Sequence, residues 1–255
     1  MPNRSNAGLR ALMYGECCFE TFRCIDYDVF ALEEHRQRLS KGLASFGLQL
    51  ASHILPEAIA QAAKTADDCM VRVTVGGGVA AWGLSATPPA QPEYWIQTLP
   101  SPQTRQPIHL QQVQWPFPLL ARQAKYTADY AMSLRALQMF KLEPHVSPLI
   151  CDAQYAHSAT TSNAAFFIHG QWLTPPADYL LSGVIRAFLL AKEVLKTSPI
   201  SLDMLADVEA IALSNSGFFI TAVASLNGRE LCVDGEIFEQ LWQPLLNQKG
   251  VKRSC

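Results

Sequence analysis

Charged side chains are scarce in this chain. They make up 16% of its 255 residues, whereas 49% are hydrophobic, and the formal net charge is only −2. Such a composition is typical of a globular protein and excludes a disordered one. The sequence also has no run of basic residues. We therefore expect no general attraction to nucleic acid or to acidic membranes.

Long apolar runs and metal-binding motifs are missing as well. No apolar stretch reaches about 18 residues and no signal peptide is recognisable, so we expect a soluble, cytoplasmic protein with no membrane partner. The seven cysteines are odd in number and have no CxxC spacing, and the six histidines form no HxxxH or HExxH pattern. We expect reduced, mostly buried thiols and no metal site.

Proline divides the chain into two halves of mixed α+β character. The stretch from Pro100 to Pro118 contains five prolines, which forbid a regular helix there. We interpret residues 108–120 as a linker between an N-terminal α/β domain, residues 1–107, and a C-terminal domain, residues 121–255. Periodicity predicts strands within 15–26, 69–78, 80–88, 93–99, 148–155, 164–175 and 207–231, and helices at 32–48, 56–66, 182–198 (with Ser182 as N-cap) and 235–248.

A lysine stands just ahead of an apolar helix pattern in "ARQAKYTADYAMSLRALQ" (121–138). Two apolar rows predict a helix with little surface in water: Tyr130, Leu134 and Leu137 form one, and Met132, Ala136 and Met139 form the other. A protonated amine is costly to bury without a partner, although a lone lysine most often reaches out to solvent. Partial burial and the nearby Arg122 would lower the pKa of Lys125.

Three further features are unremarkable singly and meaningful together. Arg38 lies in the charged helix pattern "EEHRQRL", "SGVIR" (182–186) begins a helix, and "LSNSG" (213–217) is a polar turn between apolar strands. A cofactor with a phosphate and an aldehyde needs an arginine and a helix N-terminus for the phosphate. It also needs a lysine that can lose its proton to form a Schiff base.

The order of these features resembles the class IV aminotransferases, the fold type IV pyridoxal 5'-phosphate (PLP) enzymes. That family includes branched-chain and D-amino-acid aminotransferases and 4-amino-4-deoxychorismate lyase. "CFETFR" (18–23) is similar to its Phe-Glu-Thr-x-Arg strand, "LEEHRQRL" (32–39) to its H-x-x-R-L helix, and "KYTADY" (125–130) to its Lys-x4-Tyr motif. The resemblance implies that Arg38 contacts the phosphate, Lys125 forms the Schiff base and Tyr130 bonds the ring hydroxyl.

The second half of the chain continues the resemblance. "TTSNAAFFIHGQWLTPP" (160–176) is similar to the family's strand pair, with Asn163 and Thr174 at the family spacing. "SGVIR" and "LSNSGFFITAV" resemble the two phosphate loops, which places Val184, Ile185, Asn215 and Ser216 at the phosphate. The resemblance implies an α+β, two-domain fold: a small N-terminal α/β domain, a larger C-terminal pseudo-barrel domain carrying the Schiff-base lysine, and the cofactor between them. It also implies a homodimer.

The sequence departs from the family pattern at the cofactor ring. The family has a glutamate five residues before the motif asparagine, where it keeps the pyridine nitrogen protonated; here that position is Ser158. Neither this serine nor the adjacent His157 can replace a carboxylate equally well, and Asp152 is the nearest acid. The threonine of the phosphate loop is replaced by Ile185. This sequence therefore lacks the acidic residue that usually keeps the cofactor ring protonated.

A second departure concerns the substrate carboxylate. The lyases carry Arg-Gly-Tyr where this chain has Trp82-Gly83-Leu84, and arginine is a natural clamp for a carboxylate. The remaining cationic groups suggested by the sequence are Arg105, His109 and Arg122.

Three functions fit these motifs. The short chain and the "SNS" turn favour a PLP-dependent lyase of the aminodeoxychorismate type, which eliminates pyruvate to give 4-aminobenzoate for folate synthesis. The second function is a branched-chain or D-amino-acid aminotransferase, again with a small amine or amino acid as substrate, and Tyr130 favours the branched-chain type. The neutral Ser158 favours a relative that has lost catalysis and serves as a binding protein.

Overall fold

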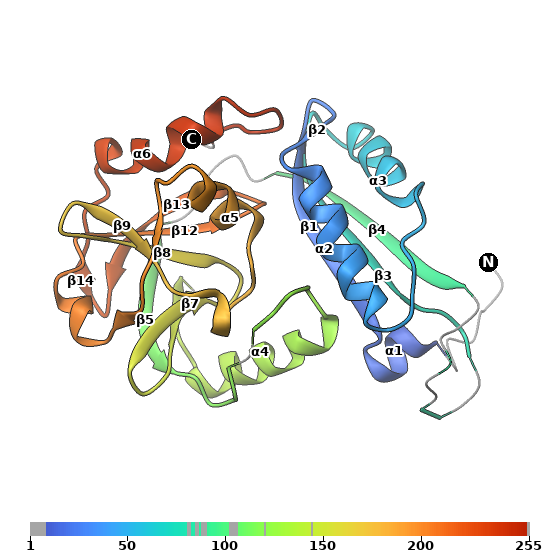
Figure 1. The fold of residues 1–255 in the computed structure, drawn as a ribbon, viewed down its shortest axis with the longest axis horizontal. Coiled ribbons are helices and arrows are strands. Elements are labelled where there is room, and N and C mark those ends of the chain that lie inside the picture. The colour runs from blue at the N-terminus through green and yellow to red at the C-terminus, as the bar shows by residue number, and fades with distance from the viewer. Residues whose placement is uncertain are drawn as a thin grey trace. The chain divides into compact units, whose positions relative to one another are not determined.

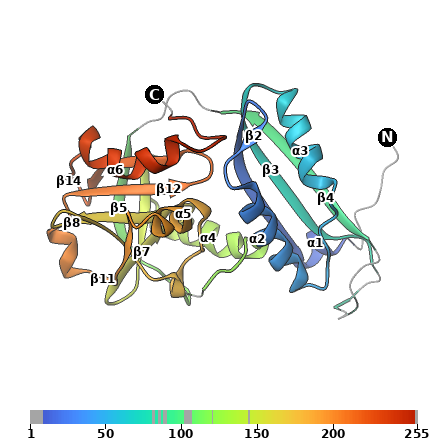
Figure 2. The same cartoon turned by 45° about the horizontal axis from the view of Figure 1, so that its top comes forward.

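The computed structural model describes residues 9–80, 83–84, 87, 91–101, 107–119, 121–143 and 145–253. The chain forms two compact units, one of residues 1–101 with 123–132 and the other of residues 102–122 with 133–255. Figures 1 and 2 show the elements of each unit. The segment with Lys125 therefore belongs to the N-terminal unit, whereas the sequence suggested a C-terminal domain that begins at residue 121 and carries this lysine.

The N-terminal unit is a four-stranded antiparallel sheet with helices on one face (Figure 1). The strand order is β2-β1-β3-β4, and the tight turn between β1 and β2 has positive φ at Asp26 and Tyr27. The elements are α1 (Arg10–Tyr14), β1 (Cys17–Ile25), β2 (Asp28–Val29), α2 (Leu32–Ala44), α3 (Ile54–Ala63), β3 (Asp68–Gly77) and β4 (Pro92–Pro100).

Alternation along β1 separates two chemically different faces. Cys18 and Phe22 point into an apolar core formed with Leu39 and Leu43 of α2 and with residues of α3 and β3. Because side chains alternate across a strand, Glu20 must point to this same face. An ionisable residue thus stands in the middle of an apolar row.

The C-terminal unit is built on a ten-stranded sheet that closes on itself, as expected for a pseudo-barrel. The strand order is β10-β9-β8-β12-β13-β5-β6-β7-β11, and the tenth strand, β14, pairs with β13 off this path. A further pairing of β7 with β8, at Ser158 and Asn163, closes the ring. The elements are β5 (Ile108–Gln114), β6 (Val146–Cys151), β7 (Tyr155–Ala159), β8 (Asn163–Ile168), β9 (Gln171–Thr174), η1 (Ala177–Tyr179), α5 (Val184–Ala191), β10 (Lys196–Thr197), β11 (Ile200–Ser201), η2 (Asp203–Ala206), β12 (Ala210–Asn215), β13 (Phe219–Leu226), β14 (Arg229–Glu230) and α6 (Gly235–Leu246). Helix α4 (Thr127–Phe140) begins in the N-terminal unit and continues into this one from residue 133.

The segment 108–120, which we interpreted as a linker, contains a strand of this barrel. β5 pairs in parallel with both β6 and β13. The prolines that suggested a linker flank this strand at Pro107 and Pro116 and leave its backbone donors free to pair. Proline count excluded a helix here but did not exclude a strand.

Helix α4 differs from its expected burial. The pattern predicted little exposure, yet Leu134 is 64% exposed and Met139 is 60% exposed, while the buried residues are Ser133 and Ala136. Ala136 packs against Trp115 and Ile150, whereas the large apolar side chains of both rows, Met132, Leu134, Leu137 and Met139, are exposed. Periodicity identified which residues share a face but not which face is covered.

Two smaller expectations were wrong at helix α5. Its N-cap is Gly183, not Ser182, and this glycine has no side chain that could cap the first turn. The helix ends at Ala191, and a positive φ at Glu193 turns the chain into β10. The expected strand 80–88 lies largely outside the described residues.

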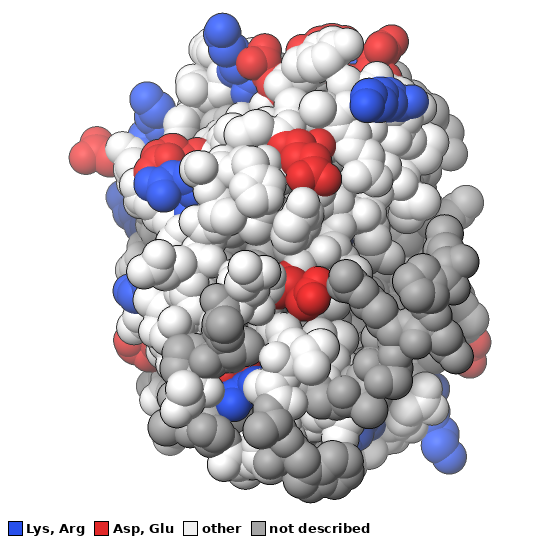
Figure 3. Space-filling model, turned by 90° about the vertical axis from the view of Figure 1, so that its right-hand side faces the viewer, with Lys and Arg blue, Asp and Glu red and all other residues white. Residues whose placement is uncertain are grey.

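The surface and the thiols follow the composition. On the face in Figure 3 the described charged side chains of both signs are interspersed among uncharged ones. All six cysteines of the described part of the chain are free, and five of them are buried. In the described residues no helix has the length and apolar character to cross a membrane.

Candidate active site

A buried ion cluster joins β1 to α2. Glu20 is completely buried, and its Oε1 and Oε2 accept hydrogen bonds from Nε and Nη2 of Arg38 at 2.7 and 2.6 Å. Nδ1 of His35 lies 2.7 Å from Oε2. Burial alone would raise the pKa of Glu20, but these hydrogen bonds outweigh it and lower the pKa to about 2. The carboxylate is therefore ionised and holds Arg38 with a two-pronged ion pair.

Lys125 lies at the edge of β1 next to this cluster. The backbone N–H of Phe19 donates to the carbonyl oxygen of Lys125 at 2.9 Å, and Tyr126 forms a β-bridge with Cys18. The edge is open here because β2 pairs only with the far end of β1. The chain segment around Lys125 thus covers the exposed edge of the strand that carries Glu20.

The surroundings of Lys125 lower the pKa of its amine, which favours loss of its proton. Burial lowers its pKa from 10.5 to about 8; the charge of Glu20 opposes this change, whereas the charges of Arg38 and Arg72 add to it. The sequence suggested burial and Arg122 as the causes. The structure agrees on burial and assigns the electrostatic part to Arg38 and Arg72.

This lowered pKa has a consequence for stability. An amine with a folded pKa of about 8 and an unfolded pKa of 10.5 destabilises the folded chain below pH 8, and the cost disappears as the pH rises through 10.5. We expect the cofactor-free variant Lys125→Met to gain about 2–3 kcal/mol relative to the wild type at pH 7, and much less near pH 10. Urea unfolding at both pH values measures this. A difference that does not change with pH would contradict it.

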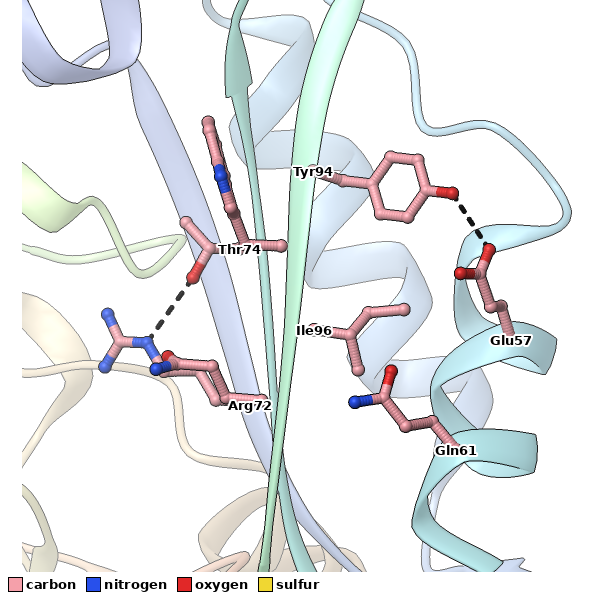
Figure 4. Close-up of a pocket in the computed structure, with 8 residues that line it drawn as sticks. Glu57, Gln61, Arg72, Thr74, Tyr94 and Ile96 are labelled. Carbon is pink, nitrogen blue, oxygen red and sulfur yellow. Dashed lines mark hydrogen bonds between the residues drawn. The ribbon is translucent and has the colours of Figure 1, made fainter. Parts of the chain in front are cut away.

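Arg72 is a functional candidate that the sequence analysis missed. Its guanidinium carbon lies 3.8 Å from the ring centroid of Phe19, and Nζ of Lys125 lies 5.5 Å from the same centroid. Nε of Arg72 donates weakly to Oγ1 of Thr74 at 3.4 Å (Figure 4), and no carboxylate of the described residues pairs with it. The guanidinium is thus held in place by an aromatic face and remains free to bind an anion.

The face of Phe19 also orders Tyr130. The two rings meet edge to face with centroids 5.0 Å apart. Phe19 is therefore a platform in contact with Arg72, Lys125 and Tyr130, and it faces away from α2 and α3. Three of the expected site residues, Lys125, Arg38 and Tyr130, thus lie in the same unit.

A surface hollow of about 740 Å³ adjoins Arg72 and Thr74. Figure 4 shows these two side chains on one side of the sheet and Glu57, Gln61 and Tyr94 on the other. The hollow therefore runs around the edge strand β4 instead of enclosing one volume. Only its Arg72 end belongs to the face that carries Phe19.

The C-terminal unit collects the other expected residues around Asn163. Nδ2 of Asn163 donates to the carbonyl of Leu181 at 3.0 Å, and Asn163 pairs across the sheet with both Ser158 and Ser214. Gly183, the N-cap of α5, fits against this asparagine because it has no side chain. The backbone N–H groups of Val184 and Ile185 follow directly and have no acceptor within the helix, which makes them candidate anion donors.

The close approach at Gly183 gives a testable requirement. A methyl group there would collide with Oδ1 of Asn163. We expect Gly183→Ala to destabilise the chain by about 2 kcal/mol, because Asn163 must move and lose its bond to Leu181. Urea unfolding of Gly235→Ala provides the control, since a methyl group at that helix start meets open space. Equal stability of the two variants would contradict the expectation.

The turn between β12 and β13 is braced by Asn215. Its Oδ1 accepts from the N–H groups of Gly217 and Phe218 at 2.9 and 3.1 Å, and its Nδ2 donates to Oγ of Ser162 at 3.1 Å. The Asn215 side chain is thus occupied in shaping the turn. An anion at this turn would have to bind the backbone or the hydroxyl of Ser216.

Asp152 is engaged in a different turn. Its Oδ1 accepts from the N–H groups of Gln154 and Tyr155, and its Oδ2 lies 2.9 Å from Nε2 of His157. Ser158 pairs with Ile150, further along β7 from this turn. Among the described residues, no carboxylate is shown to take the place of the family glutamate at Ser158.

The other suggested carboxylate partners are placed differently. Nδ1 of His109 bonds Oγ of Ser225 at 2.8 Å, and the backbone of Arg122 pairs with Leu181 ahead of α5. Arg105 and Trp82 lie outside the described residues. Arg72 is a stronger candidate than His109 because its charge is permanent and acts on Lys125.

A model of the amino-transferase class IV family matches residues 17–226. No curated protein matches the sequence significantly.

Three solved structures share the fold. A candidate 4-amino-4-deoxychorismate lyase from Legionella pneumophila has a TM-score of 0.80 at 22% identity, covering 94% of this chain and 93% of its own. A hypothetical aminotransferase from Mycobacterium tuberculosis, in its PLP-bound form, has a TM-score of 0.77 at 19% identity, with 96% and 95% covered. A branched-chain aminotransferase from Thermoproteus uzoniensis, solved with norvaline, has a TM-score of 0.78 at 18% identity, with 96% and 89% covered.

Proposed function

This chain belongs to the class IV aminotransferase family of PLP-dependent enzymes, and we propose that its Lys125 binds the cofactor covalently. The observation that carries this proposal is the position of one amine, with a pKa of about 8, beside Arg38 and Arg72. At neutral pH a useful fraction of such an amine is uncharged and can attack an aldehyde. An ordinary surface lysine would be almost fully protonated.

The residues of each unit fit the chemical groups of PLP. Arg38 and the free N–H groups at Val184 and Ile185 suit a phosphate, as does the hydroxyl of Ser216, whereas Asn215 would act through its backbone. Tyr130 is proposed to bond the ring hydroxyl, and Ser158 to face the ring nitrogen. When bound, PLP would supply an electron sink for a carbanion next to the substrate nitrogen.

Among the family reactions, we favour a lyase of the 4-amino-4-deoxychorismate type. This reaction removes a ring proton and releases pyruvate, and it leaves the aromatic product 4-aminobenzoate. Formation of the aromatic ring drives the elimination, so the reaction demands less of a protonated cofactor ring than transamination does. That fits a site with Ser158 in place of an acid. Lys125 would carry the proton, and Arg72 would hold a substrate carboxylate.

The lyase proposal is tested by product formation. Enzyme loaded with PLP is mixed with 4-amino-4-deoxychorismate, and 4-aminobenzoate and pyruvate are measured in equal amounts. Arg72→Gln should raise KM strongly while the chain still takes up PLP, because Arg72 is proposed to bind substrate. Failure of the loaded wild-type enzyme to form 4-aminobenzoate would reject the lyase activity and leave PLP binding standing.

A second candidate is an aminotransferase for branched-chain or D-amino acids. It is favoured by Tyr130, which the Phe19 ring holds on the same platform as Lys125. Adding an amino acid to the loaded enzyme should then convert the cofactor to its amine form and release a keto acid. No spectral change with the common L- and D-amino acids would reject this function.

We also propose that the protein works in the cytoplasm as a homodimer. The free thiols of the described cysteines fit a reducing compartment, and the exposed apolar rows of α4 offer surface that a second copy could cover. Sedimentation equilibrium of the loaded enzyme tests the dimer.

A further inference from the structure

Glu20 is a buried carboxylate to which the proposed function gives no task. It stands between Cys18 and Phe22 on the apolar face of β1 and is completely buried. Burying an ionised carboxylate costs free energy, and the two hydrogen bonds from Arg38 offset that cost. These bonds do not explain why a carboxylate is present at this position. An apolar residue at this position would pack against α2 without that cost.

We propose that Glu20 is the positioning residue of this site: it fixes the guanidinium of Arg38 and balances its charge at Lys125. The inference rests on the proposed function, since it assumes that Lys125 is the reacting amine. Arg38 follows Glu20 by 18 positions, and the two are joined through both prongs of the guanidinium fork. Such a bidentate bond fixes the direction of the fork as well as its place.

The charges around Lys125 show why a balance is needed. Glu20 acts on it from β1, Arg72 from β3, and Arg38 from α2. Glu20 attracts the protonated amine, and the two arginines repel it. If Glu20 were neutral, both arginines would act unopposed and Lys125 would lose its proton at a lower pH.

His35 completes the cluster without adding charge. Burial lowers its pKa, so it is neutral at physiological pH and its Nδ1–H donates to Glu20. Its Nε2 is buried and has no hydrogen-bond partner among the described residues. A histidine held at one nitrogen only is consistent with a role in orienting the carboxylate.

The experiment reads Lys125 directly in the full chain prepared without cofactor. The rate of acetylation of Lys125 by acetic anhydride is followed by peptide mass spectrometry as a function of pH, and the midpoint is the pKa of the amine. We expect a midpoint near 8 in the wild type. Glu20→Gln should lower it by about one unit or more, and Glu20→Asp, which keeps the charge, should restore most of the difference.

The double variant Glu20→Gln/Arg38→Gln separates charge balance from mere folding. It removes a compensated pair and leaves no buried unpaired charge, so it should fold even if Glu20→Gln does not. We expect its midpoint within about half a unit of the wild type, because two opposing charges are removed together. Glu33→Gln is the control, since it removes an exposed acid that pairs with Arg36 on the same helix.

The outcomes are distinct. A midpoint that is lowered in Glu20→Gln and normal in the double variant supports the proposal. Unchanged midpoints in Glu20→Gln, or a shift of more than about one unit in the double variant, overturn it. Because no cofactor is present, this result is independent of the proposed function, whose own failure would appear as no PLP uptake by the wild type.

Discussion

Replacing Lys125 with methionine is expected to abolish turnover, with a loss of at least about a thousandfold in kcat/KM. The amine would form the bond to the cofactor and would also carry the proton, so a single change removes both functions. Methionine has similar length and is compatible with the neighbouring ring of Phe19, so the fold should persist. Steady-state kinetics with PLP in excess measures the loss.

The matched control for this change is Lys64→Met. Lys64 is exposed at the C-terminal end of α3 and has no part in the proposed site. We expect kinetics like those of the wild type. If Lys125→Met kept more than a tenth of the wild-type kcat/KM, covalent catalysis by this lysine would be wrong.

Removing Arg38 is expected to have the largest effect on stability. In Arg38→Met the carboxylate of Glu20 remains buried without its cation, which typically costs about 3–5 kcal/mol. The effect should depend on pH. In the wild type the pKa of Glu20 is about 2, below its ordinary 4.5, so its stabilisation is present above pH 4.5 and is lost as the pH falls toward 2. The two proteins should therefore converge in stability at acid pH.

Arg36→Met on the same helix is the control for Arg38→Met. Arg36 pairs with Glu33, and both side chains are about half exposed. We expect a loss of less than about 1 kcal/mol, because exposed ion pairs contribute little. Chemical denaturation between pH 3 and 7 measures both variants. Equal losses in the two would show that burial of Glu20 does not carry the cost.

Much of the N-terminal unit follows from its sequence. Alternation in "CFETFR" predicts the strand, and the same alternation places Glu20 on the side of Cys18 and Phe22. What alternation cannot supply is the partner of Glu20. Arg38 is distant in sequence, and its partner became visible only when α2 was seen to pack over β1.

Arg72 was missed for a related reason. A single arginine in the apolar strand pattern "CMVRVTV" is most simply explained as a side chain that faces water. In the structure the guanidinium of Arg72 lies over the ring of Phe19, and Lys125 lies near the same ring. A contact between neighbouring strands depends on register, which the sequence of one strand does not contain.

The misplaced linker and the misjudged helix have physical causes as well. Pro107 and Pro116 bound β5 without entering it, so a local count of prolines concealed a strand of the barrel. Which face of α4 is buried depends on the rest of the fold, and its buried residues are the small Ser133 and Ala136. Both errors arise where residues distant in the sequence determine the structure that a local pattern adopts.

Reduction with borohydride tests the central claim most directly. The full chain is incubated with PLP, its absorbance is recorded, the mixture is reduced, and the labelled peptide is mapped by mass spectrometry. The account predicts visible absorbance from the protein-bound cofactor, which reduction removes, and one phosphopyridoxyl group on Lys125. A chain that stays colourless, or that carries the label on another lysine while Lys125 remains unmodified, would contradict it.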